Sequence, residues 1–130
     1  METALVLVVD DDAIQRRWLV RLLTKLGHDV IAVSTGLEGE KMLDGRRFDV
    51  AMLDIELGSN LDGITLGLIM GAMQPDLKIA LMSGNPASLE QARAAGFKDL
   101  LSKPLSSEDV EAQIAKFDRP SRPPSFPPPN

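Results

Sequence analysis

The sequence predicts an α/β domain, a doubly wound five-stranded parallel sheet with helices on both faces. Two observations lead to this prediction. Short aliphatic or β-branched runs recur along the chain, bounded by Asp, Gly or Lys, which is typical of strands buried on both faces. Helical patterns lie between these runs, and this alternation favours parallel strands that are joined by right-handed crossovers.

The predicted strands are all short. They cover residues 5–9, 30–33, 50–53, 79–82 and 100–101. None approaches the roughly 20 apolar residues that a membrane-spanning helix needs, so we expect no membrane contact.

The first predicted helix follows the first strand directly. Apolar residues recur every four positions from Ile14 to Leu26, which predicts one buried helix face. Asp12 with Gln15 is typical of a capping box at the helix start, and Gly27 is typical of a helix end. Similar patterns predict four further helices over residues 37–43, 64–73, 89–95 and 110–117.

Composition limits the classes of function. The chain has 130 residues, a formal net charge of -5, no cysteine and one histidine, His28. This argues against a nucleic-acid face, a disulfide framework and a site built from several histidines. We expect His28 to be a surface residue in a turn. We also expect one domain over residues 1–118, followed by a disordered, proline-rich tail over 119–130.

Polar side chains follow four of the five predicted strands. Asp10, Asp11 and Asp12 come after the first strand, Asp54 after the third, Ser83 after the fourth and Lys103 after the fifth. Because functional groups gather at the carboxyl ends of parallel strands, we expect these side chains to meet at one edge of the sheet. Carboxylates suit Mg²⁺, and a hydroxyl and an ammonium can contact phosphoryl oxygens. The pattern therefore favours phosphoryl transfer to a carboxylate.

Five motifs in this order resemble the receiver domain of bacterial two-component response regulators, in the single-domain, chemotaxis-type layout. They are "VVDDD", "MLDIEL", "LDGI", "LMSG" and "SKP", and the resemblance covers about residues 4–117. It implies a flavodoxin-like strand order 2-1-3-4-5 and a cis bond between Lys103 and Pro104. It also implies a cytoplasmic signalling domain that catalyses only its own phosphorylation and dephosphorylation.

The same resemblance implies a role for each site residue. Asp54 would accept a phosphoryl group from a histidine kinase or a histidine phosphotransfer protein. Asp11, Asp54 and the backbone carbonyl of Glu56 would hold Mg²⁺ or Mn²⁺, and Asp10 would act mainly through a metal-bound water. Ser83 and Lys103 would contact the phosphoryl group. Asp12 is assigned to capping the helix.

Three positions bear on how such a domain behaves. Glu56 and Asn85 lie two residues after Asp54 and Ser83, where the family tunes the phosphoryl lifetime. Leu100 lies three residues before Lys103, where the family often has Tyr or Phe, and the chain contains no Tyr. We therefore expect weaker conformational coupling through the fourth helix, the fifth strand and the fifth helix.

The predicted helix over residues 64–73 carries no charge. We expect Ile64, Leu68 and Ala72 to face the sheet. A second stripe of Leu66, Met70 and Met73 would then face outward, as a partner or homodimer face or as a surface covered by neighbouring loops.

Two other functions remain open. A haloacid-dehalogenase-type phosphatase also begins with an apolar strand and two spaced acids, which Asp10 and Asp12 would supply. That alternative leaves Asp54 without a role, and Ile14 stands where it needs Thr or Val. A phosphorylation-independent interaction module is the third interpretation, and the complete set of acids, hydroxyl and lysine argues against it.

Overall fold

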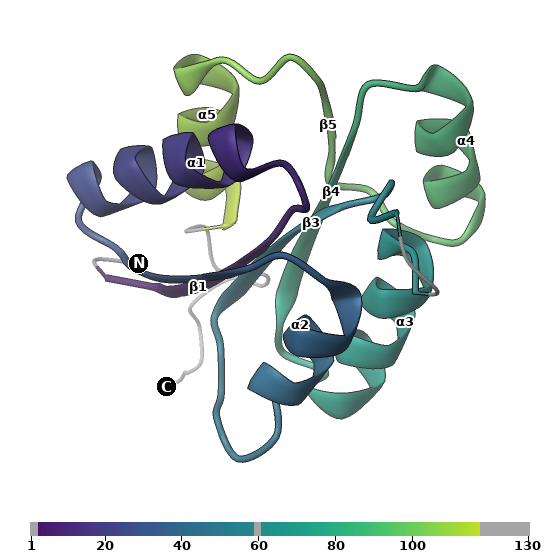
Figure 1. Ribbon diagram of the computed structural model, residues 1–130, viewed down its shortest axis with the longest axis horizontal. Helices are drawn as coiled ribbons and strands as arrows, with labels where there is room; N and C mark the ends of the chain where they lie inside the picture. The colour runs from purple at the N-terminus through teal and green to yellow at the C-terminus, as the bar shows by residue number, and fades with distance from the viewer. Residues whose placement is uncertain (1–2, 59–60, 118–130) are drawn as a thin grey trace, which may run out of the picture.

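The computed structural model describes residues 3–58 and 61–117 as a five-stranded sheet with helices on both faces (Figure 1). All of the strand pairs are parallel, and the order is β2-β1-β3-β4-β5, which confirms the predicted fold class and strand order. The strands are β1 (Leu5–Val9), β2 (Asp29–Val33), β3 (Val50–Asp54), β4 (Lys78–Ser83) and β5 (Leu100–Ser102). The predicted tail over 119–130 lies outside the described residues.

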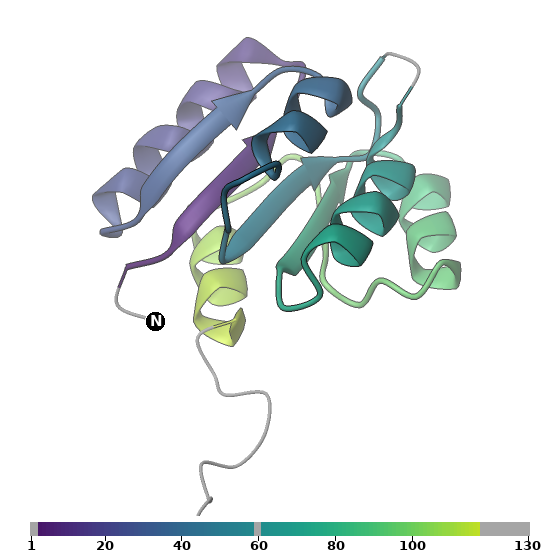
Figure 2. The same ribbon diagram turned by 90° about the horizontal axis from the view of Figure 1, so that it is seen from below.

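Helices cover the sheet in two layers. Helices α1 and α5 lie on one face, and α2, α3 and α4 lie on the other (Figures 1 and 2). Their bounds are α1 (Ala13–Lys25), α2 (Gly36–Met42), α3 (Gly63–Met73), α4 (Pro86–Ala94) and α5 (Ser107–Phe117). Among the described residues no helix is both long enough and apolar enough to cross a membrane.

Alternate strand residues build two separate cores. Val6 and Val8 of β1 pack in the cluster beneath α1 and α5, whereas Leu7 and Val9 pack in the cluster beneath α2, α3 and α4. This two-sided burial explains why the strands read as continuous apolar runs rather than alternating ones. The central strand β3 is buried over its whole length.

Side-chain caps explain where the helices begin. Asp12 caps α1, since its carboxylate accepts hydrogen bonds from the backbone N–H groups of Ile14 and Gln15, as predicted. The reciprocal capping box occurs instead at α2, between Thr35 and Glu38. Helix α4 begins earlier than predicted because Asn85 caps it and a proline at the first turn needs no N–H partner.

The orientation predicted for the third helix is wrong. Leu66 and Met70 are fully buried, while Leu68 is 54% exposed and Met73 is 42% exposed. Gly63 fixes the rotation of α3, because a Cβ there would collide with the carbonyl oxygen of Asp54. The buried face therefore continues from Gly63 at helical spacing, through Leu66 and Met70.

Helix α3 contains no charged residue, and its one polar side chain, Thr65, is exposed and lies three positions before the exposed Leu68, so it was the only hydropathy signal for the solvent face. The predicted outward face of Leu66, Met70 and Met73 does not exist as a surface. The prediction for His28 is also wrong. The residue is 7% exposed, and its Nδ1 accepts a hydrogen bond of 3.0 Å from the backbone N–H of Ala4.

Candidate functional site

Three carboxylates meet at the carboxyl edge of the sheet. One oxygen from each of Asp10, Asp11 and Asp54 lies within 4.8 Å of the others. Asp10 and Asp11 follow β1, and Asp54 ends the neighbouring strand β3. Asp10 and Asp54 are buried and Asp11 is exposed, so the cluster has one side open to solvent.

Lys103 supplies the positive charge that this cluster needs. Its Nζ lies 3.1 Å from Oδ2 of Asp10 and 3.3 Å from Oδ2 of Asp54. The lysine follows β5, and its backbone N–H donates to the carbonyl oxygen of Ser83 at the end of β4. The bond between Lys103 and Pro104 is cis, as the resemblance implied. The predicted convergence of the strand ends is thus confirmed for Asp10, Asp11, Asp54 and Lys103.

Burial dominates the electrostatics of Asp54. Desolvation, offset in part by Lys103 and reinforced by the charge of Asp10, raises the pKa of Asp54 to about 7. Burial also opposes the charged form of Lys103. The attraction of Asp54 and Asp10 outweighs that effect and raises the pKa of Lys103 above its ordinary value. The lysine therefore stays charged, while Asp54 is poised between its two protonation states near neutral pH.

The donor set fits a hard divalent cation. Three carboxylate oxygens converge, and a single ammonium faces two of the three acids. Mg²⁺ is bound by few carboxylates and keeps several waters, which suits a cluster with one exposed member. Desolvation is the largest cause of the raised pKa of Asp54, so a charged Asp54 at this buried position is stabilised only in part by Lys103 and would gain from a further positive charge.

Ser83, at the end of β4, is held by Glu56 from the loop that follows β3. Its hydroxyl donates a hydrogen bond of 2.7 Å to Oε1 of Glu56 and accepts one of 2.9 Å from the backbone N–H of Asn85. Glu56 itself donates from its backbone N–H to Oδ1 of Asp54, at 3.3 Å. The two residues predicted to tune lifetime, Glu56 and Asn85, therefore both contact Ser83.

Two contacts at the site were not predicted from the sequence. A guanidinium nitrogen of Arg16 donates to the backbone carbonyl of Asp10 at 2.7 Å. Gly63 lets the start of α3 approach β3 closely, since its N–H donates to the carbonyl of Ile55 at 2.9 Å. The motif "LDGI" contained that signal, because a glycine directly after the cap Asp62 marks a close backbone approach.

Asp12 does not join the carboxylate cluster. Its Oδ1 accepts from two backbone N–H groups at the start of α1. The phosphatase alternative required Asp12 as its second acid. Because this side chain already caps α1, it does not fill that role in the structure. Asp10 has a further local role, since its Oδ1 accepts a bond of 3.0 Å from the backbone N–H of Asp12.

The sheet order and the acidic cluster together define a class of protein. It is the class of doubly wound α/β domains with an acidic site, suited to a divalent cation, at the carboxyl ends of the central strands. A sequence model described as the response regulator receiver domain matches residues 6–115. The chain belongs to the response regulator receiver domain family, whose members are signalling domains of two-component systems.

Two related proteins share about a third of their aligned residues with this chain. The response regulator receiver protein CpdR of Brucella abortus is 31% identical over 114 residues, which cover 86% of this chain and 94% of that protein. The transcription factor SKN7 of Saccharomyces cerevisiae is 32% identical over 86% of this chain, but the match covers only 18% of SKN7. The chain thus spans less than a fifth of that relative's length.

Solved structures share the same architecture. The receiver domain of NtrX from Brucella abortus is 25% identical, with a TM-score of 0.79, over 86% of this chain and 96% of that one. A response regulator from Burkholderia pseudomallei is 28% identical, with a TM-score of 0.75, over 85% of this chain and 65% of that one. That structure contains a phosphorylated aspartic acid, a calcium ion and citrate.

Proposed function

We propose that the protein is a phosphoaccepting receiver in which Asp54 takes a phosphoryl group from a histidine kinase or a histidine phosphotransfer protein. The observation that carries the proposal is the convergence of Asp54 with Asp10, Asp11 and Lys103 at one solvent-accessible edge. Conformational change at the surrounding loops would then carry the signal. Family membership and the solved relative with a phosphorylated aspartic acid support this function.

The chain's own residues supply positioning and charge for this reaction. The Asp54 carboxylate forms the new oxygen–phosphorus bond as the donor's nitrogen–phosphorus bond breaks, and the imidazole that leaves takes up a proton. The ammonium of Lys103, 3.3 Å from Asp54, is placed to offset the negative charge on the phosphoryl oxygens. The Ser83 hydroxyl can contact another phosphoryl oxygen once it leaves Glu56.

Asp11, Asp54 and the backbone carbonyl of Glu56 would hold Mg²⁺ or Mn²⁺, with Asp10 acting through a bound water. When bound, the cation would neutralise charge on the carboxylates and on the incoming phosphoryl group. The burial of Asp10 and Asp54 supports this assignment, because buried carboxylates need a compensating charge.

An apolar surface beside the cluster supports a protein phosphodonor. Ile14 is 75% exposed at the start of α1. With Trp18, Pro104 and Leu105 it lines a shallow hollow of about 280 Å³ that Asp12 and Gln15 complete. Pro104 directly follows Lys103 in the chain, so the hollow lies next to a residue of the site, and its exposed isoleucine is suited to contact with a partner protein.

The test is phosphorylation by acetyl phosphate with Mg²⁺, followed by intact mass spectrometry. The wild type should gain the mass of one phosphoryl group, and Asp54→Asn should gain none. Asp44→Asn removes an exposed acid outside the cluster and should be labelled like the wild type. Labelling of Asp54→Asn to the wild-type extent would contradict the proposal, as would repeated turnover of p-nitrophenyl phosphate.

A further inference from the structure

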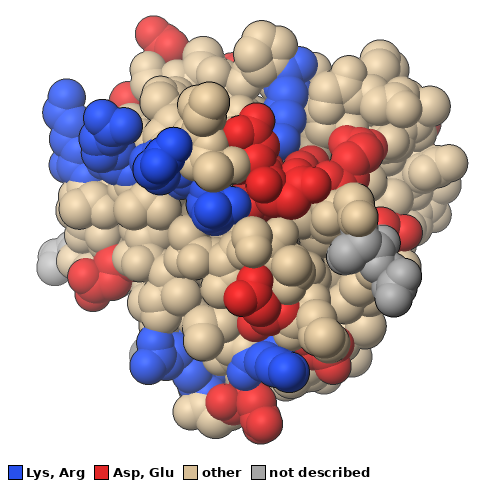
Figure 3. Space-filling model, viewed as in Figure 1, with Lys and Arg blue, Asp and Glu red and all other residues tan. Residues whose placement is uncertain are grey.

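Helix α1 carries a charge opposite to that of the chain as a whole. Its sequence contains Arg16, Arg17, Arg21 and Lys25 and no Asp or Glu, in a protein of net charge -5. Figure 3 shows a row of Lys and Arg side chains over α1 that ends beside the acids at the carboxyl edge of the sheet. Helix α1 therefore forms a local basic surface on a protein whose net charge is negative.

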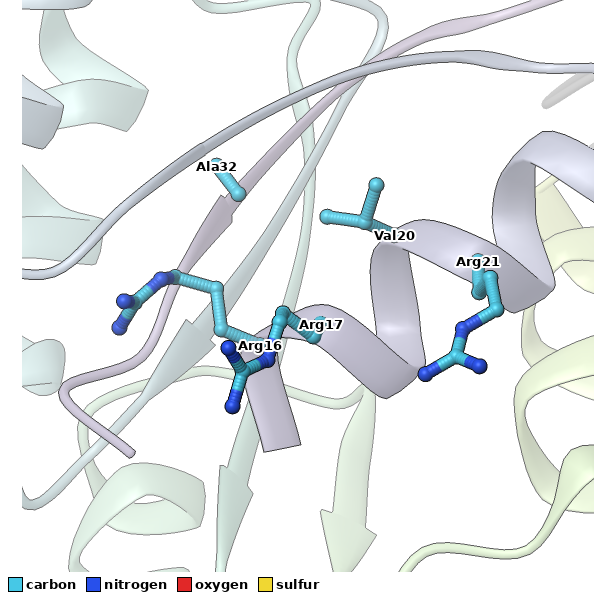
Figure 4. Close-up of a pocket in the computed structure, with 5 residues that line it drawn as sticks. All are labelled: Arg16, Arg17, Val20, Arg21 and Ala32. Carbon is cyan, nitrogen blue, oxygen red and sulfur yellow. The ribbon is translucent and has the colours of Figure 1, made fainter. Parts of the chain in front are cut away.

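The basic row borders a groove between α1 and β2. The groove has a volume of about 440 Å³ and is lined by Arg16, Arg17, Val20, Arg21 and Ala32. In Figure 4, Val20 points toward Ala32, Arg16 extends toward the strand, and Arg17 and Arg21 project from the outer side of the helix. The groove thus has an apolar floor and a cationic rim.

Strand β2 forms an edge of the sheet, and β1 is its only partner among the described residues. Asp29 donates to Ala4, and Val33 accepts from Asp10, so the odd-numbered residues of β2 make the ladder to β1. In a parallel pair the alternate residues direct their backbone groups to the other side. Val30 and Ala32 therefore present N–H and C=O groups to the open edge, next to the groove.

This edge is open to strand addition. Its sequence, "DVIAV", contains neither Lys nor Pro, the residues that commonly block an exposed edge. Alternate residues of a strand lie roughly 6.6 Å apart. That spacing is close to the rise of roughly 6 Å along the helix axis that separates Arg17 from Arg21, which are four residues apart.

We propose that the groove between α1 and β2 binds an extended acidic segment of a partner protein, which adds to β2 as a sixth strand. Its backbone pairs with Val30 and Ala32, and acidic side chains at alternate positions face Arg16, Arg17 and Arg21. A small anion would contact the arginines without using the strand edge. An extended peptide uses both features of the groove, which is why we assign it this occupant.

The test uses the full chain and two fluorescently labelled peptides. One peptide alternates Glu with Val, and the other has the same composition with all Glu residues in one block. Binding is followed by fluorescence anisotropy for the wild type and for Arg17→Glu with Arg21→Glu. The matched control is Arg46→Glu with Lys98→Glu, which reverses two exposed charges away from the groove. Amide hydrogen exchange by NMR then reports on Val30 and Ala32.

The alternating peptide should bind the wild type and the control equally, and the reversal in α1 should weaken its binding by about tenfold or more. The peptide should also slow amide exchange at Val30 and Ala32. The proposal is overturned if the blocked peptide binds as well as the alternating one, or if neither peptide binds. Binding without slower exchange at β2, or displacement by equimolar inorganic phosphate, would overturn it too.

Discussion

At the scale of the residue, the chemistry depends on how Asp54 tolerates its burial. Its carboxyl is almost inaccessible, and desolvation raises its pKa to about 7. Lys103 offsets part of that cost, but it also faces Asp10. The negative charge of the acids is therefore only partly offset by Lys103, and a bound cation would offset more of it.

This balance predicts how stability depends on pH without metal. The pKa of Asp54 is about 7 when folded and 3.8 when unfolded, so the folded state retains a proton that the unfolded state releases between those values. Raising the pH through this window therefore destabilises the wild type. Asp54→Asn should be more stable than the wild type by up to about 4 kcal/mol above pH 7, and equal to it near pH 4.

Urea unfolding at several pH values, in a chelating buffer, measures this difference. Added Mg²⁺ should stabilise the wild type but not Asp54→Asn. A difference in unfolding free energy that is constant from pH 4 to pH 8 would contradict the assigned electrostatics.

Glu56 is the second residue with a specific expectation. Its carboxylate accepts a hydrogen bond from Ser83, and such bonds to charged groups contribute roughly 1.5–3 kcal/mol. Glu56→Ala frees the hydroxyl and removes a negative charge, so phosphorylation by acetyl phosphate should become at least about threefold faster. We also expect a changed phosphoryl lifetime, measured by loss of the mass label.

A double-mutant cycle with Ser83→Ala separates the two effects of Glu56. The part that comes from freeing the hydroxyl should disappear in the Ser83→Ala background, whereas the part that comes from charge should remain. Unchanged dephosphorylation in both Glu56→Ala and Asn85→Ala would refute a role for this pair in setting lifetime.

At the scale of the element, the position of α3 is fixed by the close contact of Gly63 with the backbone at the end of β3. A Cβ at Gly63 would meet the backbone of Asp54 and Ile55, whereas a Cβ at Gly71 would make only an ordinary contact, 3.8 Å from Ile79. Gly63→Ala should therefore destabilise the fold by at least about 2 kcal/mol. Gly71→Ala is the matched control and should stabilise it by roughly 0.5–1 kcal/mol through helix propensity.

Both values come from urea unfolding monitored by circular dichroism. The phosphoryl label should also be lost more readily from Gly63→Ala, because any shift of α3 moves the end of β3. Equal stabilities for the two alanine variants would show that α3 is not fixed by contact with β3.

A further prediction at this scale concerns Leu100 on β5. The family often uses an aromatic side chain there, and a half-buried leucine cannot swing between two sites in the same way. Phosphorylation should therefore produce small NMR shifts along α4, β5 and α5, beyond the cap at Asn85. Large shifts confined to that face would refute the expected weak coupling.

At the scale of the whole molecule, the α/β fold class and the convergence at the carboxyl edge were predictable from the residues, and the strand order followed from the family resemblance. Strand ends carry the acids, and parallel topology brings them to the same edge. The cap at Asp12 was predictable for a different reason, because a cap depends only on the few residues at the start of the helix.

The features that sequence could not supply depend on contacts between distant segments. Helix α3 has no charged residue and a single polar one, Thr65, so its rotation depends on the fit of Gly63 against β3 more than on periodicity. The partner that satisfies the buried ring of His28 is the backbone N–H of Ala4, which lies 24 residues away in the chain. The bonds from Ser83 to Glu56 and from Arg16 to Asp10 likewise need rotamers that no spacing rule provides.

The most direct measurement identifies the residue that carries the phosphoryl group. The protein is labelled with acetyl phosphate and Mg²⁺ and then reduced with borohydride, which converts an aspartyl phosphate to homoserine, and its peptides are sequenced by mass spectrometry. The account predicts homoserine at residue 54 and at no other acid. Homoserine at Asp10 or Asp11 with Asp54 unmodified, or no modified peptide in a chain that is folded and binds Mg²⁺, would contradict it.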